Sequence, residues 1–238
     1  MAHPELALTP EQQERINDSL LRLERGESFP YVLGHWEFFG LDFQVTPDVL
    51  IPRPETELLV EKTIGWLKKN PERRNIADVG TGTGAIAISI AVNIPNVKIL
   101  ATDISSKALQ VAKRNADKHV AFSKIKFVEC DLLPEKSSID VLCANLPYIP
   151  TDTLHKLPVF GREPTLALDG GNDGFALIQR LMQNAPEHLK PNSLILFEIE
   201  ESLGREAIVL AKEYFNNATI QLHKDLARRD RLLEIQFP

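Results

Sequence analysis

The stretch CANLPYIP, from Cys143 to Pro150, places a carboxamide, two prolines and a phenol directly after an apolar run. An apolar run that ends in this way is typical of a buried strand that breaks into a stiff loop. Turn propensity accounts for Asn145 and Pro147, because both residue types start turns. It does not account for Tyr148 beside them. The segment is therefore a candidate for chemistry.

A second candidate is the glycine-rich stretch DVGTGTGA at residues 78–85, between an expected strand and an expected helix. A doubly wound sheet binds nucleotide-like ligands at this position. Glycines let the backbone turn sharply and approach a ligand, and the N-terminus of the helix offers free N–H donors. Three alternating glycines favour a ligand site over a plain turn. The expected contacts are Gly80, Thr81, Gly82, Thr83 and Gly84.

Acidic residues follow three successive expected strands around the same crevice. Asp78 lies two residues before the first glycine, where it can orient the loop and reach a cationic amino group. Asp103, in ILATDIS, can accept hydrogen bonds from both hydroxyls of a ribose. Asp131 and Leu132, in VECDLL, can border an adenine. Each of these acids could also be a simple helix N-cap, and this alternative is strongest for Asp131.

The identity of the ligand is left open by these residues alone. Gly80, Gly82 and Ala85 also satisfy the dinucleotide fingerprint, so an NAD-binding protein is an alternative. Asp78 favours S-adenosylmethionine (SAM), because its carboxylate can pair with an amino group. Asp103 serves the ribose of either ligand.

The tetrapeptide Asn145-Leu146-Pro147-Tyr148 resembles the Asn-Pro-Pro-Tyr signature of SAM-dependent methyltransferases that act on planar amino nitrogens. The resemblance implies that the Asn145 side-chain oxygen and the Leu146 carbonyl each accept one N–H of the target nitrogen. Held in line with the methyl group, the nitrogen can develop positive charge beside these acceptors. Tyr148 would lie against the flat amide or base. Pro147 completes the motif.

Leu146 departs from that signature, which has proline at this position. The chemistry needs a carbonyl there, and leucine supplies one. Leu146 still precedes Pro147 and is biased to an extended conformation, whereas Asn145 no longer precedes a proline. The expected difference is one of rigidity.

Flanking segments narrow the resemblance to bacterial release factor glutamine N5-methyltransferases, over about residues 29–238. The similar segments are PYVLGHWEFFGLDFQVTPDVLIPRPETELLV, EPTLALDGGNDGFALIQRL and HKDLARRDRLLEI. The resemblance implies that SAM is the cofactor and S-adenosylhomocysteine the product. The implied partner is a peptide chain release factor, whose Gly-Gly-Gln glutamine is the substrate. Residues that fall where the hairpin and linker would close over the cofactor are Phe38, Pro52, Arg53 and Thr56.

The N-terminus departs from that family, which normally begins with a multi-helix domain that grips the release factor. Residues 1–28 have room for roughly one helix. We expect them to form a shortened substrate-binding segment. Residues 29–53 are expected to form a β-hairpin and linker, and residues 54–238 the methyltransferase domain.

The elements that must position these residues can be read from the pattern. Thr9 as N-cap, Pro10 and Gln12 predict the start of a first helix, which places Ile16 and Leu20 on one face. A hairpin and a helix over residues 54–70 follow. Beyond them, apolar strands alternate with amphipathic helices, which indicates a parallel sheet covered on both faces.

The last two strands, TIQLHK and RLLEIQF, are joined by a connection too short for a helical crossover. One of them should therefore run antiparallel to its neighbour. The predicted fold is α/β, a doubly wound, mostly parallel, seven-stranded sheet. This is the Rossmann-like arrangement of class I SAM-dependent methyltransferases, here with a small N-terminal helix and hairpin.

Composition sets further limits on function. The 238 residues carry a formal net charge of -6, which does not predict direct nucleic-acid binding. Two cysteines suggest no disulfide framework and no zinc site. Neither a signal peptide nor a membrane span is visible, so we expect a cytoplasmic monomer.

Three other functions stay open at this point. An amino-methylase acting on nucleic acid or on another protein would share the tetrapeptide, but a target-recognition region and a basic cleft are not apparent. The chain could also bind SAM without activity, or depend on NAD. Titration with SAM and NAD separates those two, and a methyl-transfer assay separates the enzymes.

Overall fold

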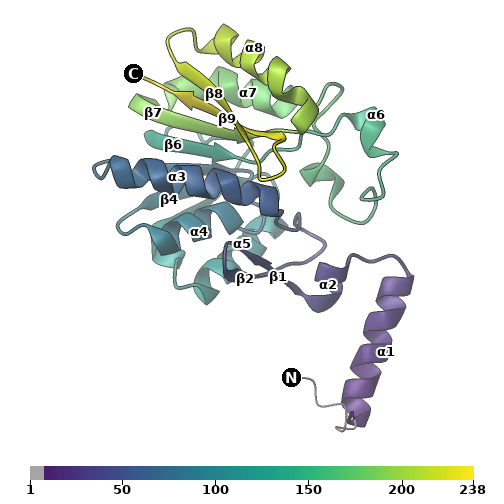
Figure 1. The fold of residues 1–238 in the computed structure, drawn as a ribbon. Coiled ribbons are helices and arrows are strands. Elements are labelled where there is room, and N and C mark those ends of the chain that lie inside the picture. Colours follow the sequence, from purple (N-terminus) through teal and green to yellow (C-terminus); the bar gives the residue numbers. More distant parts are fainter. Residues whose placement is uncertain (1–7) are drawn as a thin grey trace.

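The computed structural model describes residues 8–238, which contain a seven-stranded sheet in the order β5-β4-β3-β6-β7-β9-β8 (Figure 1). β9 pairs antiparallel with both β7 and β8, and the other pairs are parallel. The predicted sheet is confirmed, including the antiparallel closing strand. The strands are β3 (Asn75–Val79), β4 (Lys98–Asp103), β5 (Ile125–Glu129), β6 (Ile139–Ala144), β7 (Leu189–Glu198), β8 (Thr219–Lys224) and β9 (Asp230–Gln236).

Helices cover both faces of the sheet. On one face lie α3 (Glu57–Lys69), α4 (Ala85–Asn93) and α5 (Ser106–Lys118). On the other lie α7 (Ala176–Asn184) and α8 (Gly204–Tyr214). Side-chain alternation assigns each strand residue to a face: in β6, Val141 and Cys143 pack with the first group, and Leu142 and Ala144 with the second.

The site is positioned by the point at which the strand order reverses. From β3 the chain crosses outward to β4 and then β5, and it returns to β6 on the other side of β3. β3 and β6 are parallel, and Val79 is in register with Ala144. The residues that follow these two strands are therefore neighbours. Two segments 65 residues apart, which begin at Gly80 and Asn145, meet at one edge of the sheet.

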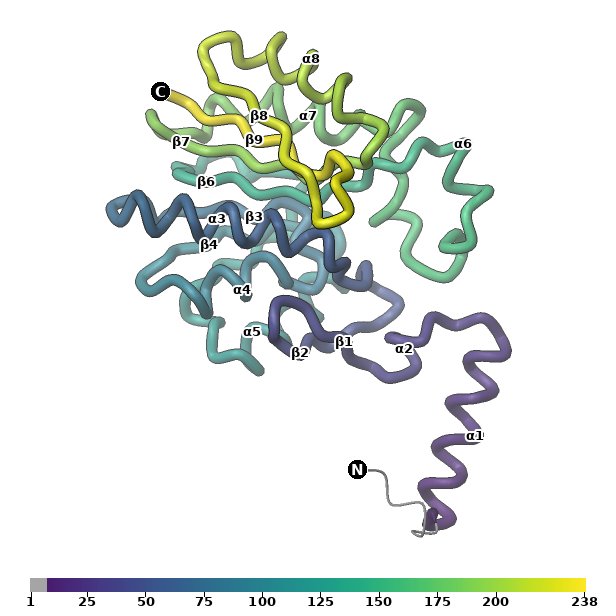
Figure 2. Tube along the Cα trace, in the orientation of Figure 1, coloured from purple at the N-terminus to yellow at the C-terminus, as the bar shows by residue number. Residues whose placement is uncertain are grey.

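The first helix, α1 (Pro10–Glu24), begins as predicted with a capping box between Thr9 and Gln12. None of its residues is buried, so the shared face of Ile16 and Leu20 does not pack on the sheet domain. α1 extends away from the rest of the molecule (Figures 1 and 2). A short helix, α2 (Phe29–Leu33), follows, which the sequence did not predict.

The hairpin consists of β1 (His35–Phe38) and β2 (Leu41–Gln44), paired antiparallel. Asn115, buried on α5, joins it to the domain. Its Oδ1 accepts from Gln44 N–H at 2.7 Å, and its Nδ2 donates to the carbonyl oxygens of Gln44 at 3.0 Å and Thr83 at 2.9 Å. One side chain therefore ties the hairpin to the glycine loop.

Short helical segments complete the described chain: η1 (Pro54–Thr56), η2 (Phe122–Lys124), α6 (Thr151–Leu154), η3 (Thr165–Ala167), η4 (Ala185–Glu187) and η5 (Glu201–Leu203). Among residues 8–238 no helix has the length and apolar character to cross a membrane. Over the same range, no group of His, Cys, Asp or Glu side chains is arranged to hold a metal ion.

Candidate active site

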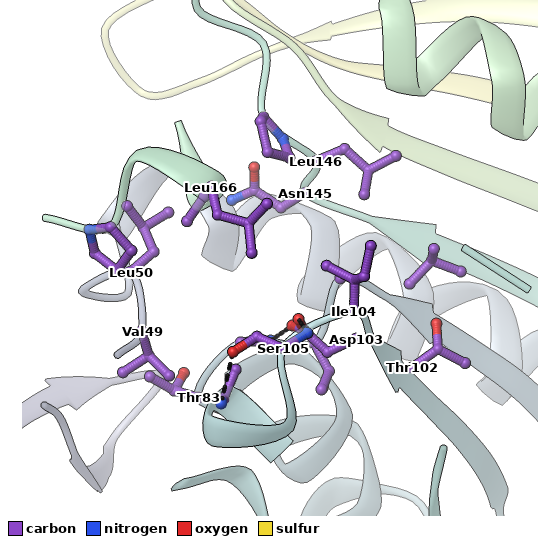
Figure 3. A pocket seen from close by; sticks show the side chains of 18 of the residues that line it. Val49, Leu50, Thr83, Thr102, Asp103, Ile104, Ser105, Asn145, Leu146 and Leu166 are labelled. Carbon is purple, nitrogen blue, oxygen red and sulfur yellow. Dashed lines mark hydrogen bonds between the residues drawn. The ribbon is translucent and has the colours of Figure 1, made fainter. Parts of the chain in front are cut away.

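A cavity of about 390 Å³ lies where β3, β4 and β6 end, beside the segment that follows β5. Figure 3 shows Val49 and Leu50 on one side of it and Ile104 on another, with Asn145 above and Thr83 below. Most of the residues expected from the sequence line this cavity. They are Gly80, Thr81, Gly82, Thr83, Asp103, Asp131, Leu132, Asn145, Leu146 and Pro147.

The glycine loop uses left-handed backbone at Gly80, Gly82 and Gly84, with φ of 74°, 54° and 81°. A Cβ at Gly84 would lie 2.9 Å from Ile88 Cδ1 on α4 and 3.2 Å from Ala112 Cβ on α5, so glycine is required for the close packing at this position. Several loop amides are already satisfied within the protein. The Gly80 and Thr81 N–H groups donate to the Thr102 carbonyl at 2.9 and 2.8 Å. The loop therefore brings its backbone close to the cavity, but its Gly80 and Thr81 N–H groups are not free to donate to a ligand.

Asp78 lies beneath the loop and does not line the cavity. Its Oδ2 accepts from the Thr81 hydroxyl at 2.6 Å and from the Ala87 N–H at 3.2 Å, so it orients the loop as predicted. Burial raises the pKa of this carboxyl to about 6. Its Oδ1 has no hydrogen-bond partner among residues 8–238. Because Asp78 does not line the cavity, its contact with a cofactor amino group stays a prediction.

Asp103, at the end of β4, lines the cavity. Its Oδ2 accepts from Gly82 N–H and its Oδ1 from Ser105 N–H, both at 2.9 Å. Burial raises the pKa of the carboxyl. Because each carboxylate oxygen can accept two hydrogen bonds, each one keeps capacity for a further donor. The two carboxylate oxygens of Asp103 can therefore accept from the two neighbouring hydroxyls of a ribose.

Asp131 and Leu132 follow the end of β5 and line the cavity. Asp131 is half exposed, and its carboxylate pairs with the Arg180 guanidinium rather than capping a helix. Leu132 is buried in a left-handed conformation with φ of 62°. The Thr102 hydroxyl donates to its carbonyl at 2.6 Å, which holds it there.

Asn145 presents its carboxamide at the cavity edge. The Nδ2 group donates to Thr56 Oγ1 at 3.0 Å, which leaves Oδ1 as an acceptor. Among residues 8–238, the neighbouring Leu146 carbonyl accepts no hydrogen bond. The Leu146 side chain packs against the glycine loop, where a Cβ on Gly80 would lie 3.0 Å from Leu146 Cδ2. Asn145 Oδ1 and the Leu146 carbonyl are thus two neighbouring acceptors with free capacity.

Tyr148 was expected to lie against the flat amide or base of the substrate, but in the structure its ring does not line the cavity. Its hydroxyl donates to Glu198 Oε1 at 3.3 Å, and burial raises its pKa. Its backbone packs tightly against Gly170, where an added Cβ would lie 2.7 Å from Tyr148 Cα. Tyr148 therefore supports the cavity wall from behind.

Glu198, at the end of β7, was missed by the sequence interpretation. It is buried, and desolvation raises the pKa of its carboxyl to about 7. The hydroxyls of Thr56 and Tyr148 and the charge of Arg231 partly oppose that shift. The sequence contained a signal for Glu198 as a site residue, because this acid follows the apolar residues of the strand SLILFE at its carboxyl end.

Three of the four hairpin and linker residues that were expected near the cofactor lie at the cavity. Pro52, Arg53 and Thr56 line the cavity, whereas Phe38 does not. Phe38 lies in the core instead, with its ring edge-on to Phe43 at a centroid distance of 6.1 Å. The hairpin ring was expected over the cofactor, but it is buried in the core cluster that also contains side chains of α3 and α4.

A carboxylate that the sequence did not single out holds the linker in place. Glu163 pairs with the Arg53 guanidinium and accepts from Ile51 N–H at 3.2 Å. Because Arg53 and Pro164 both line the cavity, this contact joins two segments of its rim.

The fold and site together define a class I SAM-dependent methyltransferase. The family model described as "Methyltransferase domain" matches residues 72–233. A release factor glutamine methyltransferase of Moorella thermoacetica is 41% identical over 97% of this chain and 82% of its own length. That of Flavobacterium psychrophilum is 37% identical over 98% of this chain and 84% of its own. The chain therefore belongs to the release factor glutamine methyltransferase family.

A solved structure agrees with this family. The protein-(glutamine-N5) methyltransferase (release factor-specific) from Alicyclobacillus acidocaldarius is 26% identical, with a TM-score of 0.51. The match covers 82% of this chain and 99% of that one.

Proposed function

We propose that this enzyme transfers the methyl group of SAM to the side-chain amide nitrogen (N5) of the glutamine in the Gly-Gly-Gln motif of a peptide chain release factor. The observation that carries the proposal is the pair of acceptors at Asn145 Oδ1 and the Leu146 carbonyl, at the edge of the cavity beside the glycine loop. A primary amide offers two N–H groups from one nitrogen, so two adjacent acceptors suit it.

The mechanism follows from these groups. Bound SAM supplies an electrophilic methyl group on a positively charged sulfur. An amide nitrogen is a poor nucleophile, because its lone pair is shared with the carbonyl. Asn145 and Leu146 hold both of its hydrogens, which aligns the nitrogen and stabilises the positive charge that it gains. The methylated nitrogen then loses a proton readily, so the site needs no strong base.

The cofactor side is assigned in the same way. Asp103 would accept from the ribose hydroxyls, and Leu132 and Ile104 would border the adenine. The Gly80–Thr83 backbone would contact the amino acid portion, with Asp78 holding the loop from below. The assignment rests on the free capacity of Asp103 and on the apolar surface of the cavity walls.

The decisive experiment is a methyl-transfer assay with radiolabelled SAM. The substrates are a release factor and its Gln→Ala variant at the Gly-Gly-Gln motif. We expect label on the first and none on the second, with N5-methylglutamine identified by mass spectrometry. Equal labelling of both would overturn the substrate assignment, and labelling of RNA instead would redirect it to nucleic acid.

We also propose that the enzyme acts in the cytoplasm, because its proposed substrate is a translation factor. We propose further that it acts as a monomer. The net charge of -6 supports a protein target over a polyanionic one. Size-exclusion chromatography with light scattering tests the oligomeric state.

A further inference from the structure

We propose that Glu163 and Arg53 are positioning residues for methyl transfer, because together they hold the turn that carries Thr56 against Asn145. The inference rests on the proposed function, in which the Asn145 carboxamide accepts from the target nitrogen. Glu163 does not line the cavity, so it acts on the reaction through other residues. Neither Glu163 nor Arg53 belongs to the tetrapeptide.

The Glu163 carboxylate uses its two oxygens on two different groups of the linker. Its Oε1 accepts from the Arg53 guanidinium, and its Oε2 accepts from Ile51 N–H at 3.2 Å. Only 5% of the Glu163 side chain is exposed, against 36% of that of Arg53. A buried carboxylate is costly unless it is paired and hydrogen-bonded, so both contacts are needed. Glu163 therefore fixes the linker on both sides of Pro52.

Arg53 passes this constraint to the tetrapeptide. It is the residue at which the linker enters η1, and its carbonyl accepts from Thr56 N–H at 3.0 Å. The buried Thr56 in turn accepts from Asn145 Nδ2 through its Oγ1, also at 3.0 Å. Consecutive contacts therefore lead from the Glu163 carboxylate to the Asn145 carboxamide.

The chain that follows the tetrapeptide returns to Glu163 from the other side. Ile149 N–H donates to the Leu168 carbonyl at 3.1 Å, and Gly170 N–H donates to the Ile149 carbonyl at 2.9 Å. The segment that starts at Glu163 is thus tied back to the chain just after Asn145. The ion pair therefore closes a ring of contacts that contains the Asn145 carboxamide.

This ring surrounds the opening through which the substrate must enter. Leu50 and Arg53 line the cavity from the linker, and Pro164 and Leu166 line it from the segment after Glu163 (Figure 3). The ion pair thus holds the two sides of the opening at a fixed separation.

Loss of the ion pair would release the linker at Arg53, and Thr56 would move with it. The Asn145 carboxamide would then lose the partner of its NH₂ group. Because a displacement of about 1 Å can cost about 10²-fold in rate, turnover should fall. Affinity for SAM should change little, because the bonds of Asp103 and the packing of Val49 on α5 do not involve Glu163.

The kinetic test measures kcat on a release factor and the Kd for SAM in the wild type, E163Q, R53M and the double variant. The amide in E163Q has one acceptor oxygen for two donors, so one of the two contacts is lost. E163Q should lower kcat about 10-fold to 100-fold and leave the Kd for SAM within about 3-fold. R53M removes the same ion pair. The double variant should be no slower than the slower single variant, because both act through one contact.

R53K is the conservative variant. Arg53 contacts Glu163 through a single nitrogen, so the ammonium of lysine can take its place. We expect R53K to keep kcat within about 3-fold of the wild type, unlike R53M. A role that depended only on the bulk of the side chain would not separate these two variants.

The matched control is D140N. Asp140 is also a buried carboxylate that bonds an arginine and the backbone, with Arg73 Nη1 at 3.3 Å and Asn75 N–H at 2.9 Å. It lies near the start of β6, whereas the cavity lies where β6 ends. D140N should keep the wild-type kcat, and its binding of SAM shows that it is folded.

Two kinetic outcomes would overturn the inference. One is a kcat for E163Q equal to that of D140N. The other is a double variant in which the loss of kcat is the product of the two single losses, because Glu163 and Arg53 would then act separately.

A second readout needs no substrate. In protein labelled with ¹⁵N-asparagine, the NH₂ resonances of Asn145 report on its bond to Thr56, and T56V gives their position when that bond is absent. E163Q and R53M should move the resonances toward the T56V position, and D140N should leave them unchanged. Unchanged resonances in E163Q overturn the inference. A wild-type enzyme that leaves every release factor unlabelled, while E163Q shifts these resonances, would overturn the proposed function alone.

Discussion

Two walls of the cavity are held in different ways. We call Gly80–Thr83 with Asp103 the cofactor wall, and Asn145–Pro147 the amide wall. Much of the cofactor wall is supported from nearby in the chain: Thr81 bonds Asp78 three residues away, and Asp103 bonds Ser105 two residues away. The amide wall is supported from far away. Asn145 bonds Thr56 across 89 residues.

The difference shows how binding and chemistry are divided. The hydrogen bonds of the cofactor wall join it to residues within 78–130, whereas the amide wall is bonded to the linker before the sheet. The amide wall depends on η1 and β7, because Thr56 on η1 bonds Asn145 and Glu198 at the end of β7 bonds Tyr148, the residue that follows the wall. Changes in the cofactor wall should therefore affect ligand affinity, and changes in the amide wall should affect turnover.

Asn145→Ala should have the largest effect. We expect a loss of about 10²-fold to 10³-fold in kcat, because one of two acceptors for the target nitrogen is removed. Affinity for SAM, measured by calorimetry, should be nearly unchanged. Asn93→Ala is the control, because Asn93 donates only to the Ser89 carbonyl on α4. A collapse of SAM binding in Asn145→Ala would show that the two walls are not separate.

Asp103→Ala should give the opposite result. Loss of a carboxylate that accepts from charged or hydroxyl groups weakens SAM binding by about 10-fold to 100-fold. At saturating SAM, kcat should stay within a few-fold of the wild type. Asp131→Ala, which removes a half-exposed partner of Arg180, should change the Kd by less than about 3-fold. Equal effects of the two substitutions would contradict the assigned role of Asp103.

The buried carboxyl beneath the cofactor wall predicts a pH-dependent stability. The pKa of Asp78 is raised from 3.8 to about 6, so between these values the folded state binds more protons than the unfolded state. The free energy of unfolding should therefore fall as pH rises through this window, by about 3 kcal/mol. Glu198 acts in the same direction, with a pKa raised from 4.5 to about 7.

Chemical denaturation between pH 4 and 8 measures this dependence. Asp78→Asn cannot ionise, so its unfolding free energy should vary less with pH than that of the wild type. A slope identical to the wild type would mean that Asp78 does not titrate in this range.

Gly80→Ala tests the joint between the two walls and should have the smallest effect. Its φ of 74° is strained for alanine, and the new Cβ would lie 3.0 Å from Leu146 Cδ2. Gly40→Ala is the matched control, with a φ of 71° and open space around it. We expect Gly40→Ala to cost about 1 kcal/mol of unfolding free energy and Gly80→Ala more.

The excess cost of Gly80→Ala should shrink in a Leu146→Ala background, where the contact is absent. If the excess persists there, the side chain of Leu146 is not what joins the walls.

The sequence predicts what depends on local backbone chemistry. Gly80–Thr83 of the glycine loop and Asp103 line the cavity as the sequence led us to expect, because alternating glycines after a strand and an acid at the next strand end are typical of a ligand site in this fold. The ring of Tyr148 does not line the cavity as expected, because its hydroxyl bonds Glu198 and its backbone is packed against Gly170. No local pattern contains those two contacts.

The same limit applies to the first helix and the hairpin. Thr9 and Gln12 fix the start of α1 by a local capping box, and this was predicted correctly. The sequence did not show which side chains are covered by packing. Ile16 is exposed, and Phe38 is buried in the core. Amphipathic spacing shows that a face exists, but only the tertiary structure shows what covers it.

Asn115 has a consequence for the stability of the β1–β2 hairpin. Two strands of four residues each would be marginal alone in water. Because the Asn115 carboxamide bonds both Gln44 of β2 and the carbonyl of Thr83, and because Phe38 and Phe43 are buried in the core, the stability of the hairpin is coupled to that of the sheet domain. Amide protons of β2 and of the loop should then exchange with solvent together, as one cooperative unit.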